Sequence, residues 1–146
     1  MAIPLSGKIL GGFLRVHQFV YERTGGRVGA SLRGRPVLLL RTTGRRSGKA
    51  RVAALLYVRD GEDYVVIAST GGRDVHPGWY FNLADGAPAE IQIGRERTAV
   101  TASDAGGERR KRLWAEADRV NQGGYSRYQS NTDREIPVVV LSPASR

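Results

Sequence analysis

A short segment of the chain concentrates side chains that bind anions. Between Glu22 and Asp60 the sequence has ten Arg and Lys residues and no acidic residue, and residues 42–51, near the centre of this window, read TTGRRSGKAR. Guanidinium, ammonium and hydroxyl groups, together with the accessible backbone N–H groups of a Gly/Ser-rich turn, are donors that hold phosphates and carboxylates. The sequence therefore predicts an anion site in this segment.

The elements on either side must position this site. Residues 37–40 and 52–58 are apolar runs of strand length, so the simplest arrangement is a strand, a tight basic turn and a second strand. The segment is not a nucleotide-binding P-loop, because Gly44 and Gly48 are one residue too close together. In addition, Ala50 occupies the position where a P-loop has Ser or Thr.

The rest of the chain alternates strand patterns with short helical ones. The Asp60-Gly61 dipeptide is typical of a hairpin turn, and the segment around Tyr125 and Tyr128 is expected to be a loop. Further strands are expected at residues 64–68, 89–93, 97–102 and 136–141, and helices at residues 7–22, 78–83 and 107–121. Six strands at hairpin spacing predict a mainly β (α+β) fold, a small antiparallel barrel with a few flanking helices.

Composition excludes several classes of protein. At 146 residues the chain is expected to be one domain, residues 1–146, with an N-terminal helix and loop up to residue 29. There is no cysteine, and His17 and His76 are far apart, so a disulfide framework or a metal site is not expected. The net charge of +9 indicates a polyanionic ligand, nucleic acid or an anionic membrane surface. No apolar run is long enough to span a bilayer, and we expect a cytoplasmic protein.

Three segments in register resemble one protein family. They are residues 44–51 (GRRSGKAR), residues 68–83 (with ASTGG and PGWYFNL) and residues 125–137 (YSRYQSNTDREIP). In this order and spacing, the chain resembles the deazaflavin-dependent nitroreductase and quinone reductase family of actinobacteria over residues 30–142. The resemblance implies a split β-barrel of the flavin-binding type. It also implies an oxidoreductase that passes a hydride from reduced coenzyme F420 to a quinone, a nitroaromatic or an activated enone.

The resemblance also implies which residues hold this coenzyme, which carries a phosphate, a tail of glutamates and a flat ring. The basic turn is expected to bind the phosphate and tail, two strands to line the ring, and the short helix and Tyr125 to close over it. The expected cofactor-binding residues are Arg45, Arg46, Ser47, Arg51, Val52, Ala53, Ala54, Leu55, Leu56, Ile67, Ala68, Ser69, Thr70, Gly78, Trp79, Tyr80, Phe81, Asn82 and Tyr125. Thr70 stands where the family often has lysine, which removes one contact with the tail.

Three hydroxyl side chains are candidates for chemistry with the acceptor. Because the coenzyme supplies the hydride, the protein mainly aligns the acceptor and excludes water. Ser69 ends a buried strand beside the expected ring site, where a hydroxyl would stabilise negative charge on the acceptor oxygen. Tyr125 and Tyr128 are three residues apart in a glycine-preceded loop, which suits a mobile lid. Solvent is an equally good proton donor, and packing of the loop is the structural alternative for both tyrosines.

Three further classes of ligand are compatible with parts of the sequence. The same barrel type includes proteins that bind flavin mononucleotide or haem, and a basic barrel can bind nucleic acid through arginines and stacked aromatic rings. The aromatic residues cluster outside the strands, which disfavours nucleic acid. His76 is expected to be an ordinary loop histidine, and Trp79, Tyr80 and Phe81 also suit a core or a wall. The basic N-terminal helix would allow peripheral contact with the membrane, while the acceptor, the oligomeric state and the tail length stay open.

Overall fold

The structure is a computed structural model that describes residues 31–32 and 35–144, so the predicted helix at residues 7–22 lies outside the described residues. The helices and strands are β1 (Ser31–Leu32), β2 (Arg35–Thr43), β3 (Ala50–Leu56), β4 (Val58–Asp60), β5 (Asp63–Ile67), η1 (Thr70–Gly72), α2 (Gly78–Asn82), η2 (Ala84–Gly86), β6 (Ala89–Ile93), β7 (Glu96–Asp104), α3 (Gly107–Val120), α4 (Gly124–Ser130) and β8 (Val138–Pro143).

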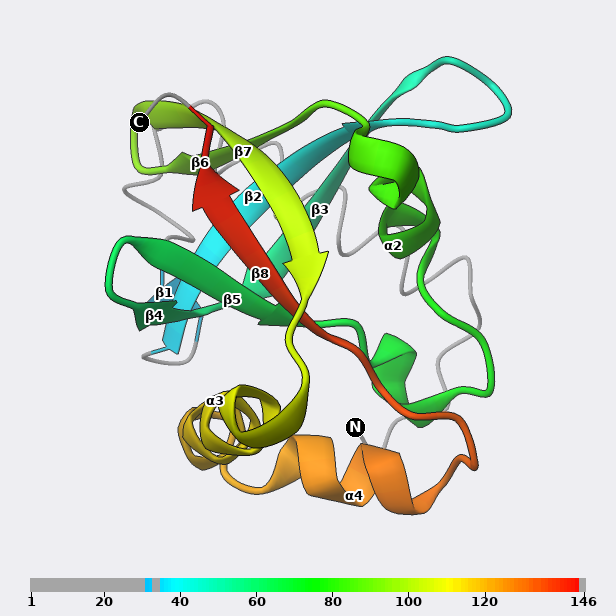
Figure 1. The fold of residues 1–146 in the computed structure, drawn as a ribbon, viewed down its shortest axis with the longest axis vertical. Coiled ribbons are helices and arrows are strands. Elements are labelled where there is room, and N and C mark those ends of the chain that lie inside the picture. The colour runs from blue at the N-terminus through cyan, green and yellow to red at the C-terminus, as the bar shows by residue number, and fades with distance from the viewer. Residues whose placement is uncertain (1–30, 33–34, 145–146) are drawn as a thin grey trace.

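The strands form one curled antiparallel sheet, the split barrel that was predicted (Figure 1). Its strand order is β1-β2-β6-β7-β8-β5-β4. The strand β3 is not part of this order and pairs with β2. The basic turn joins β2 to β3, with Leu40 opposite Ala53 and Thr43 opposite Ala50. The helix α2 lies near the turn that joins these two strands, whereas α3 and α4 lie together at the other end of the molecule (Figure 1).

Both faces of the sheet are buried over much of its area. In β8, Val138 and Val140 pack in one core with α3 and α4, whereas Val139 and Leu141 pack in the other core with β2 and β6. Because side chains alternate along a strand, a continuous run such as Val-Val-Val-Leu is expected where both faces are covered.

The structure has eight strands in its described part, not the six predicted. β1 is only two residues long, and the apolar run at residues 52–58 is divided at Tyr57 into β3 and β4. The division occurs because the chain changes partners, since Leu56 pairs with β2 and Val58 pairs with β5. Hydrophobic periodicity does not reveal such a change inside one apolar run. The predicted helices at residues 78–83 and 107–121 and the other predicted strands are confirmed to within about three residues.

A second correction concerns the segment around Tyr125 and Tyr128, which was predicted to be a loop. It forms the helix α4, which packs against α3 and the η1 segment. Gly123 precedes the helix with a φ of +78°, a left-handed conformation that glycine adopts readily. The sequence GYSRYQS has weak helix propensity, so the helix depends on burial of Tyr125 in the core beneath α3.

Candidate functional site

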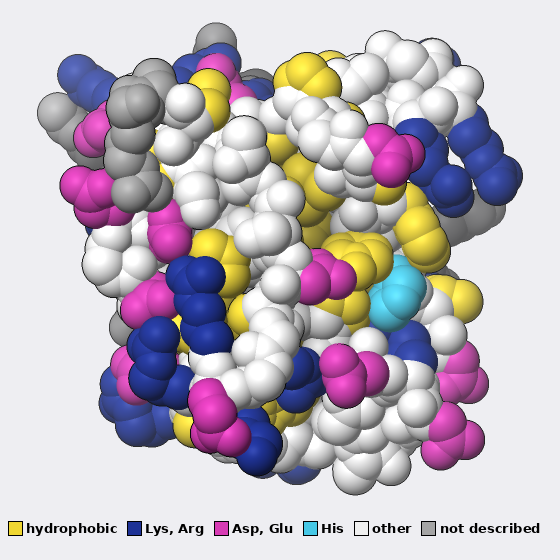
Figure 2. All heavy atoms as spheres, viewed as in Figure 1, with side chains coloured by type: hydrophobic (Ala, Val, Ile, Leu, Met, Phe, Trp, Pro, Cys, Tyr) yellow, Lys and Arg dark blue, Asp and Glu magenta, His cyan; other side chains and the backbone are white. Residues whose placement is uncertain are grey.

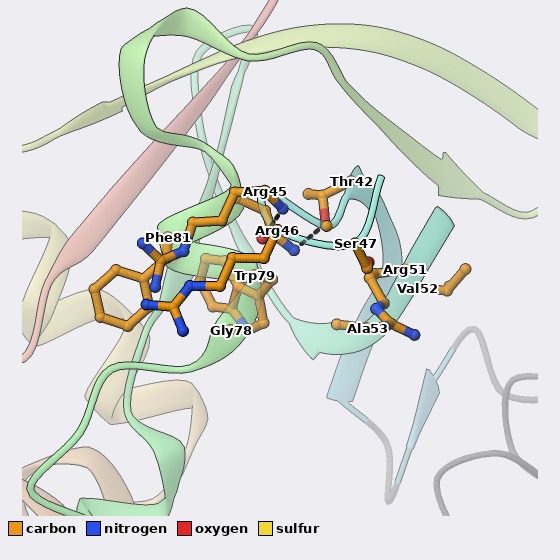
Figure 3. A pocket seen from close by; sticks show the side chains of 12 residues that line it. Thr42, Arg45, Arg46, Ser47, Arg51, Val52, Ala53, Gly78, Trp79 and Phe81 are labelled. Atoms are coloured by element: carbon orange, nitrogen blue, oxygen red, sulfur yellow. Dashed lines mark hydrogen bonds between the residues drawn. The ribbon is translucent and has the colours of Figure 1, made fainter. Parts of the chain in front are cut away.

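An open cleft of about 380 Å³ lies between the β2–β3 turn and α2. Figure 3 shows side chains from both elements converging on it. The residues that line it are Thr42, Gly44, Arg45, Arg46, Ser47, Arg51, Val52, Ala53, Gly78, Trp79, Phe81 and Asn82. All except Thr42 and Gly44 were predicted to bind the cofactor, so the structure gathers the central part of the predicted site into one place.

Backbone hydrogen bonds hold the basic turn in shape. The N–H of Gly44 donates to the Lys49 carbonyl, and the N–H of Gly48 donates to the Gly44 carbonyl, both at 2.8 Å. The Ser47 Oγ atom accepts from the Lys49 N–H at 3.2 Å. A Cβ atom at position 44 would lie 2.5 Å from Ser47 Oγ, so a larger residue there would displace the Ser47 hydroxyl. Gly44 is therefore part of the geometry that presents this hydroxyl.

The helix α2 is tied to this turn by one buried amide. Asn82, which is 9% exposed, donates from Nδ2 to the hydroxyl of Thr42, which is 5% exposed. The Asn82 Oδ1 atom accepts from the backbone N–H of Arg45. Because both ends of the amide are used, α2 and the turn move as a unit. The position of Trp79 relative to the arginines is set by this connection.

The arginines of the turn have no acidic partner among the described residues. Arg45, Arg46 and Arg51 are exposed and form no ion pair there, and the Arg45 guanidinium instead lies 4.6 Å from the centre of the Phe81 ring. In Figure 2 a separate group of basic side chains projects from the turn, whereas basic and acidic side chains are mixed over α3. Unpaired cations beside an aromatic wall are suited to a polyanion that also carries a ring.

Several predicted cofactor-binding residues lie outside the cleft. Ala54, Leu55 and Leu56 continue β3 beyond it and are half-buried. Ile67 and Ala68, at the end of β5 and just after it, are buried in the two cores. The cleft therefore accounts for the predicted phosphate and tail contacts better than for the whole predicted ring wall.

Tyr80, also predicted to bind the cofactor, faces a second hollow of about 270 Å³ between α2 and β7, which Figure 2 shows lined by hydrophobic atoms. Its phenol donates to Asp104 Oδ2 at 2.5 Å. Burial, followed by the hydrogen bond to Asp104 and the charge of that carboxylate, raises the pKa of Tyr80 to about 12. The phenol stays protonated at neutral pH and is engaged with Asp104.

Ser69 and Thr70 stand where β5 leads into η1, and neither lines the cleft. Ser69 is half-buried, and its hydroxyl makes no capping hydrogen bond to η1. Thr70 has a φ of +49°, an uncommon conformation for a residue with a side chain, and its hydroxyl donates to the Val75 carbonyl at 2.8 Å. Ser69 itself has an ordinary backbone conformation, and the unusual one begins at the next residue, Thr70.

Tyr125 and Tyr128 lie on α4, not on a lid loop. Tyr125 is 7% exposed, and its ring centre is 6.3 Å from those of Trp114 and Tyr128. Tyr128 is half-buried, and its backbone packs closely against Gly72 of η1. Neither tyrosine lines the cleft. The structure brings Tyr128 to the Ser69 segment and places Tyr125 in the core behind it.

Arg134 and His76 were not predicted to belong to the site. The Arg134 side chain reaches back to the segment after β5, where it bonds to the Ser69 carbonyl and to His76 Nδ1. His76 does lie in a loop, as expected, but its ring packs against Tyr80 with centroids 4.8 Å apart. Arg134 belongs to a segment that carries the family resemblance, yet nothing in the sequence pattern reveals where its side chain ends.

Other chemistry finds no support in the part of the chain that the structure covers. No group of three or more His, Cys, Asp and Glu residues that could hold a metal ion occurs among the described residues. None of the described helices is long and apolar enough to cross a membrane.

Solved structures confirm the fold. An F420-H2 dependent reductase (FDR-A) is 38% identical with a TM-score of 0.66, over 74% of this chain and 95% of that chain. A protein solved as a domain-swapped dimer is 32% identical with a TM-score of 0.69, over 94% of this chain and 100% of that chain. A haem storage protein of Vibrio cholerae, 16% identical with a TM-score of 0.53 over 90% of this chain and 89% of that chain, shares the fold alone.

Sequence relatives agree with the chemistry of the cleft. The chain is 42% identical over 132 residues to F420H(2)-dependent quinone reductases from two strains of Mycobacterium tuberculosis, covering 88% of this chain and 89% of the relative. The family model described as F420H(2)-dependent quinone reductase matches residues 13–143. The arginines that lack acidic partners among the described residues, the split barrel and these matches agree, and the chain belongs to the F420H(2)-dependent quinone reductase family.

Proposed function

We propose that this chain reduces quinones with a hydride from coenzyme F420 and binds the coenzyme's phosphate and glutamate tail in the cleft beside α2. Family membership supplies the reaction. The observation that supports this placement is the set of three arginines, Arg45, Arg46 and Arg51, without acidic partners in the described chain.

The residues present fit such a polyanion. Arg46 lies within the turn and Arg51 near the start of β3, and both are exposed, so both are accessible to a phosphate or to successive carboxylates. Ser47 adds a hydroxyl donor between them. Charge-assisted hydrogen bonds are about twice as strong as neutral ones, which favours this cleft over the acid-paired arginines of α3. Trp79 and Phe81 provide an apolar wall on the other side.

The edge of β3 is the proposed wall for the ring. Among the described strands β3 pairs only with β2, so we assign the wall for the ring to its other edge. When bound, the reduced deazaflavin supplies the hydride. The residues of β3, the end of β5 and α2 hold the ring and acceptor in line and keep water out.

Ser69 and Tyr128 are the proposed hydroxyl donors to the acceptor. The Ser69 hydroxyl is not used to cap η1, and Tyr128 packs beside the same segment. A hydroxyl aimed at the acceptor oxygen would stabilise the charge that develops as the hydride arrives. Because Tyr125 is buried, we assign it a supporting role behind Tyr128 rather than a direct contact.

The range of acceptors and the location of the protein extend this proposal. Nitroaromatics and activated enones share with quinones an electron-poor centre that accepts a hydride, so we include them as further substrates. We also propose a cytoplasmic enzyme with peripheral contact with the inner face of the membrane, which would suit a lipid-soluble quinone. The basic N-terminal segment that would make this contact lies outside the described residues.

A direct assay tests the proposal. Purified protein is mixed with the reduced deazaflavin and a panel of quinones, nitroaromatics and enones, and the return of the oxidised deazaflavin absorbance is followed. Reduced flavin mononucleotide and a labelled oligonucleotide serve as competing ligands. Quinone-dependent oxidation is the expected result. Tight binding of flavin or oligonucleotide without any deazaflavin oxidation would overturn the proposed function.

A further inference from the structure

One guanidinium holds most of the segment between β5 and α2. The Arg134 Nε atom donates to the Arg73 carbonyl at 2.7 Å, and Nη2 donates to the Ser69 carbonyl at 2.7 Å and to Thr70 Oγ1 at 3.2 Å. Nη1 donates to the Ala68 carbonyl at 3.2 Å. Figure 1 shows the segment between α4 and β8 passing beside this part of the chain. The Arg134 guanidinium thus donates its hydrogen bonds to neutral acceptors of a single segment.

That segment has a backbone that would not hold its shape unaided. Thr70, Gly71 and Gly72 all have positive φ values, of 49°, 63° and 84°. Such a run is costly when a residue with a side chain takes part, so it needs outside support. A Cβ atom on Gly72 would lie 2.9 Å from the Tyr128 carbonyl oxygen, so α4 supports the segment from the other side. The hydrogen bond from Arg134 and the packing of α4 therefore hold the backbone at Ser69, whereas the Ser69 hydroxyl makes no capping hydrogen bond to η1.

The same guanidinium also contacts His76. The Arg134 Nη1 atom lies 2.9 Å from His76 Nδ1, and since arginine can only donate, His76 accepts and is neutral. The imidazole packs against Tyr80 at 4.8 Å and against Phe81 at 5.7 Å between ring centroids. Phe81 lines the cleft. Arg134 therefore connects the backbone of Ser69 with the helix that walls the proposed coenzyme site.

We propose that Arg134 and neutral His76 form a positioning pair that holds Ser69 and α2 in the orientation required for hydride transfer, and that protonation of His76 releases it. The proposal rests on the proposed role of Ser69. Protonated His76 could no longer accept from Arg134, and two cations would face each other at hydrogen-bond distance.

The groups that face His76 come from three elements. Arg134 approaches from the segment before β8, Asp104 from the end of β7, and the protonated phenol Tyr80 from α2. Burial and then the charge of Arg134 lower the pKa of His76, whereas Asp104 raises it. The net lowering of its pKa keeps His76 neutral at pH 7, so release is expected only in acidic conditions.

Nuclear magnetic resonance of the protein without coenzyme tests the pair directly. The imidazole signals of His76 are assigned by their loss in His76→Asn and titrated in the parent, Arg134→Lys, Arg134→Gln and the charge-loss control Arg95→Gln. Removal of the guanidinium is expected to raise the pKa of His76 in Arg134→Gln, and Arg95→Gln is expected to match the parent. If the pKa of His76 in Arg134→Gln were the same as in the parent, the proposed pairing would be wrong.

The pH dependence of turnover tests the function of the pair. Turnover of the parent is expected to fall at acid pH, which gives its pH profile an acid limb. In His76→Asn, which keeps a neutral acceptor, turnover is expected not to fall in this way. Arg134→Gln is expected to lower kcat by a factor on the order of 10 to 100, because small displacements near a reacting centre are costly, and Arg134→Lys is expected to recover part of it. An acid limb retained in His76→Asn would overturn the release mechanism.

Ser69→Ala separates this inference from the proposed function. In one outcome, Ser69→Ala turns over like the parent, while Arg134→Gln raises the pKa of His76 and slows turnover. The proposed role of Ser69 is then wrong, and the pair acts through α2. If Ser69→Ala is slow and Arg134→Gln is as fast as the parent, the role of Ser69 stands and the positioning pair is wrong.

Discussion

Asn82 and Thr42 form a buried hydrogen bond that joins α2 to the end of β2, with Nδ2 of the amide 3.1 Å from the threonine Oγ1 atom. The Oδ1 atom of the same amide accepts from the Arg45 N–H, also at 3.1 Å. One side chain thereby uses its donor and its acceptor to set the distance between the aromatic wall of the cleft and its arginines. The cleft is built by this amide as much as by the residues that face a ligand.

Asn82→Ala is expected to weaken both the fold and the site. The substitution leaves the buried Thr42 hydroxyl and the Arg45 N–H without their partner, which costs about 1–3 kcal/mol of the free energy of unfolding. Urea denaturation measures that loss, and deazaflavin titration of the folded variant is expected to show weaker binding. Asn131→Ala, at an exposed position on the far side of the molecule, is the matched control. Unchanged stability and affinity in Asn82→Ala would contradict the coupling.

Replacing Arg46 or Arg51 with alanine is expected to weaken coenzyme binding by about 1.5–3 kcal/mol, the range for hydrogen bonds to charged groups. Affinity of the parent should also fall as salt rises, and this dependence should be smaller in each variant, because fewer charges take part. Fluorescence titration of the deazaflavin at low and high salt measures both effects. Arg95→Ala, in the exposed β6–β7 turn, controls for net charge. Variants that bind as tightly as the parent would place the phosphate elsewhere.

Asp60 makes stability depend on pH. It accepts hydrogen bonds from Arg112 and Arg109 of α3, which hold the pKa of its carboxyl below the usual range. A group with a lowered pKa in the folded state contributes stability above its unfolded pKa and loses it as pH falls through the folded value. Asp60→Asn is therefore expected to be less stable than the parent at pH 7, by under about 1 kcal/mol since the pairs are accessible to solvent.

The difference between Asp60→Asn and the parent should shrink as pH falls below the ordinary carboxyl pKa of about 4 and through the lower pKa of the folded state. Urea denaturation of both proteins at neutral and acid pH measures this change. Glu96→Gln, in the exposed part of β7, is the control for loss of one carboxylate. A difference that stayed constant across the acid range would show that the ion pairs do not stabilise the fold.

The features that depend on residues close together in the sequence could be predicted. The apolar runs of the strands, the Asp60-Gly61 turn and the Gly/Ser-rich basic turn are local patterns, and the corresponding hairpins are present. The proposed phosphate-binding part of the site could be predicted for the same reason, because Arg45, Arg46, Ser47 and Arg51 are close in the sequence and belong to one hairpin.

The remainder depends on contacts between distant segments. The helix α4 has weak propensity and exists because Tyr125 is buried under α3, which no local pattern reports. The Asn82 and Arg134 side chains act across 40 and 65 residues of sequence, on Thr42 and Ser69 respectively. The family resemblance predicted Asn82 as a cofactor contact, whereas the structure shows its hydrogen bond to Thr42 of β2.

Tyr125 is expected to act mainly on stability. Because its ring is buried between α3 and the sheet, Tyr125→Ala should lower the free energy of unfolding by about 3–5 kcal/mol, the cost of removing a large buried ring. Tyr125→Phe keeps the ring and should retain most of the stability and the turnover of the parent. Thermal unfolding measures the stability of each variant, and steady-state assays measure its turnover. A Tyr125→Phe variant that folds normally but loses turnover would restore a direct catalytic role.

Ser69 and Tyr128 are expected to act on the chemical step. Ser69→Ala should slow hydride transfer by about tenfold or more, because a hydroxyl aimed at a developing oxyanion stabilises the transition state. Tyr128→Phe should slow it in part, and Tyr128→Ala should change which acceptors are used by opening space beside η1. Single-turnover mixing of the reduced coenzyme with excess quinone isolates this step from product release, and Thr101→Ala, exposed on β7, is the hydroxyl-loss control. Parent-like hydride transfer in all three variants would remove Ser69 and Tyr128 from the mechanism and leave proton delivery to solvent.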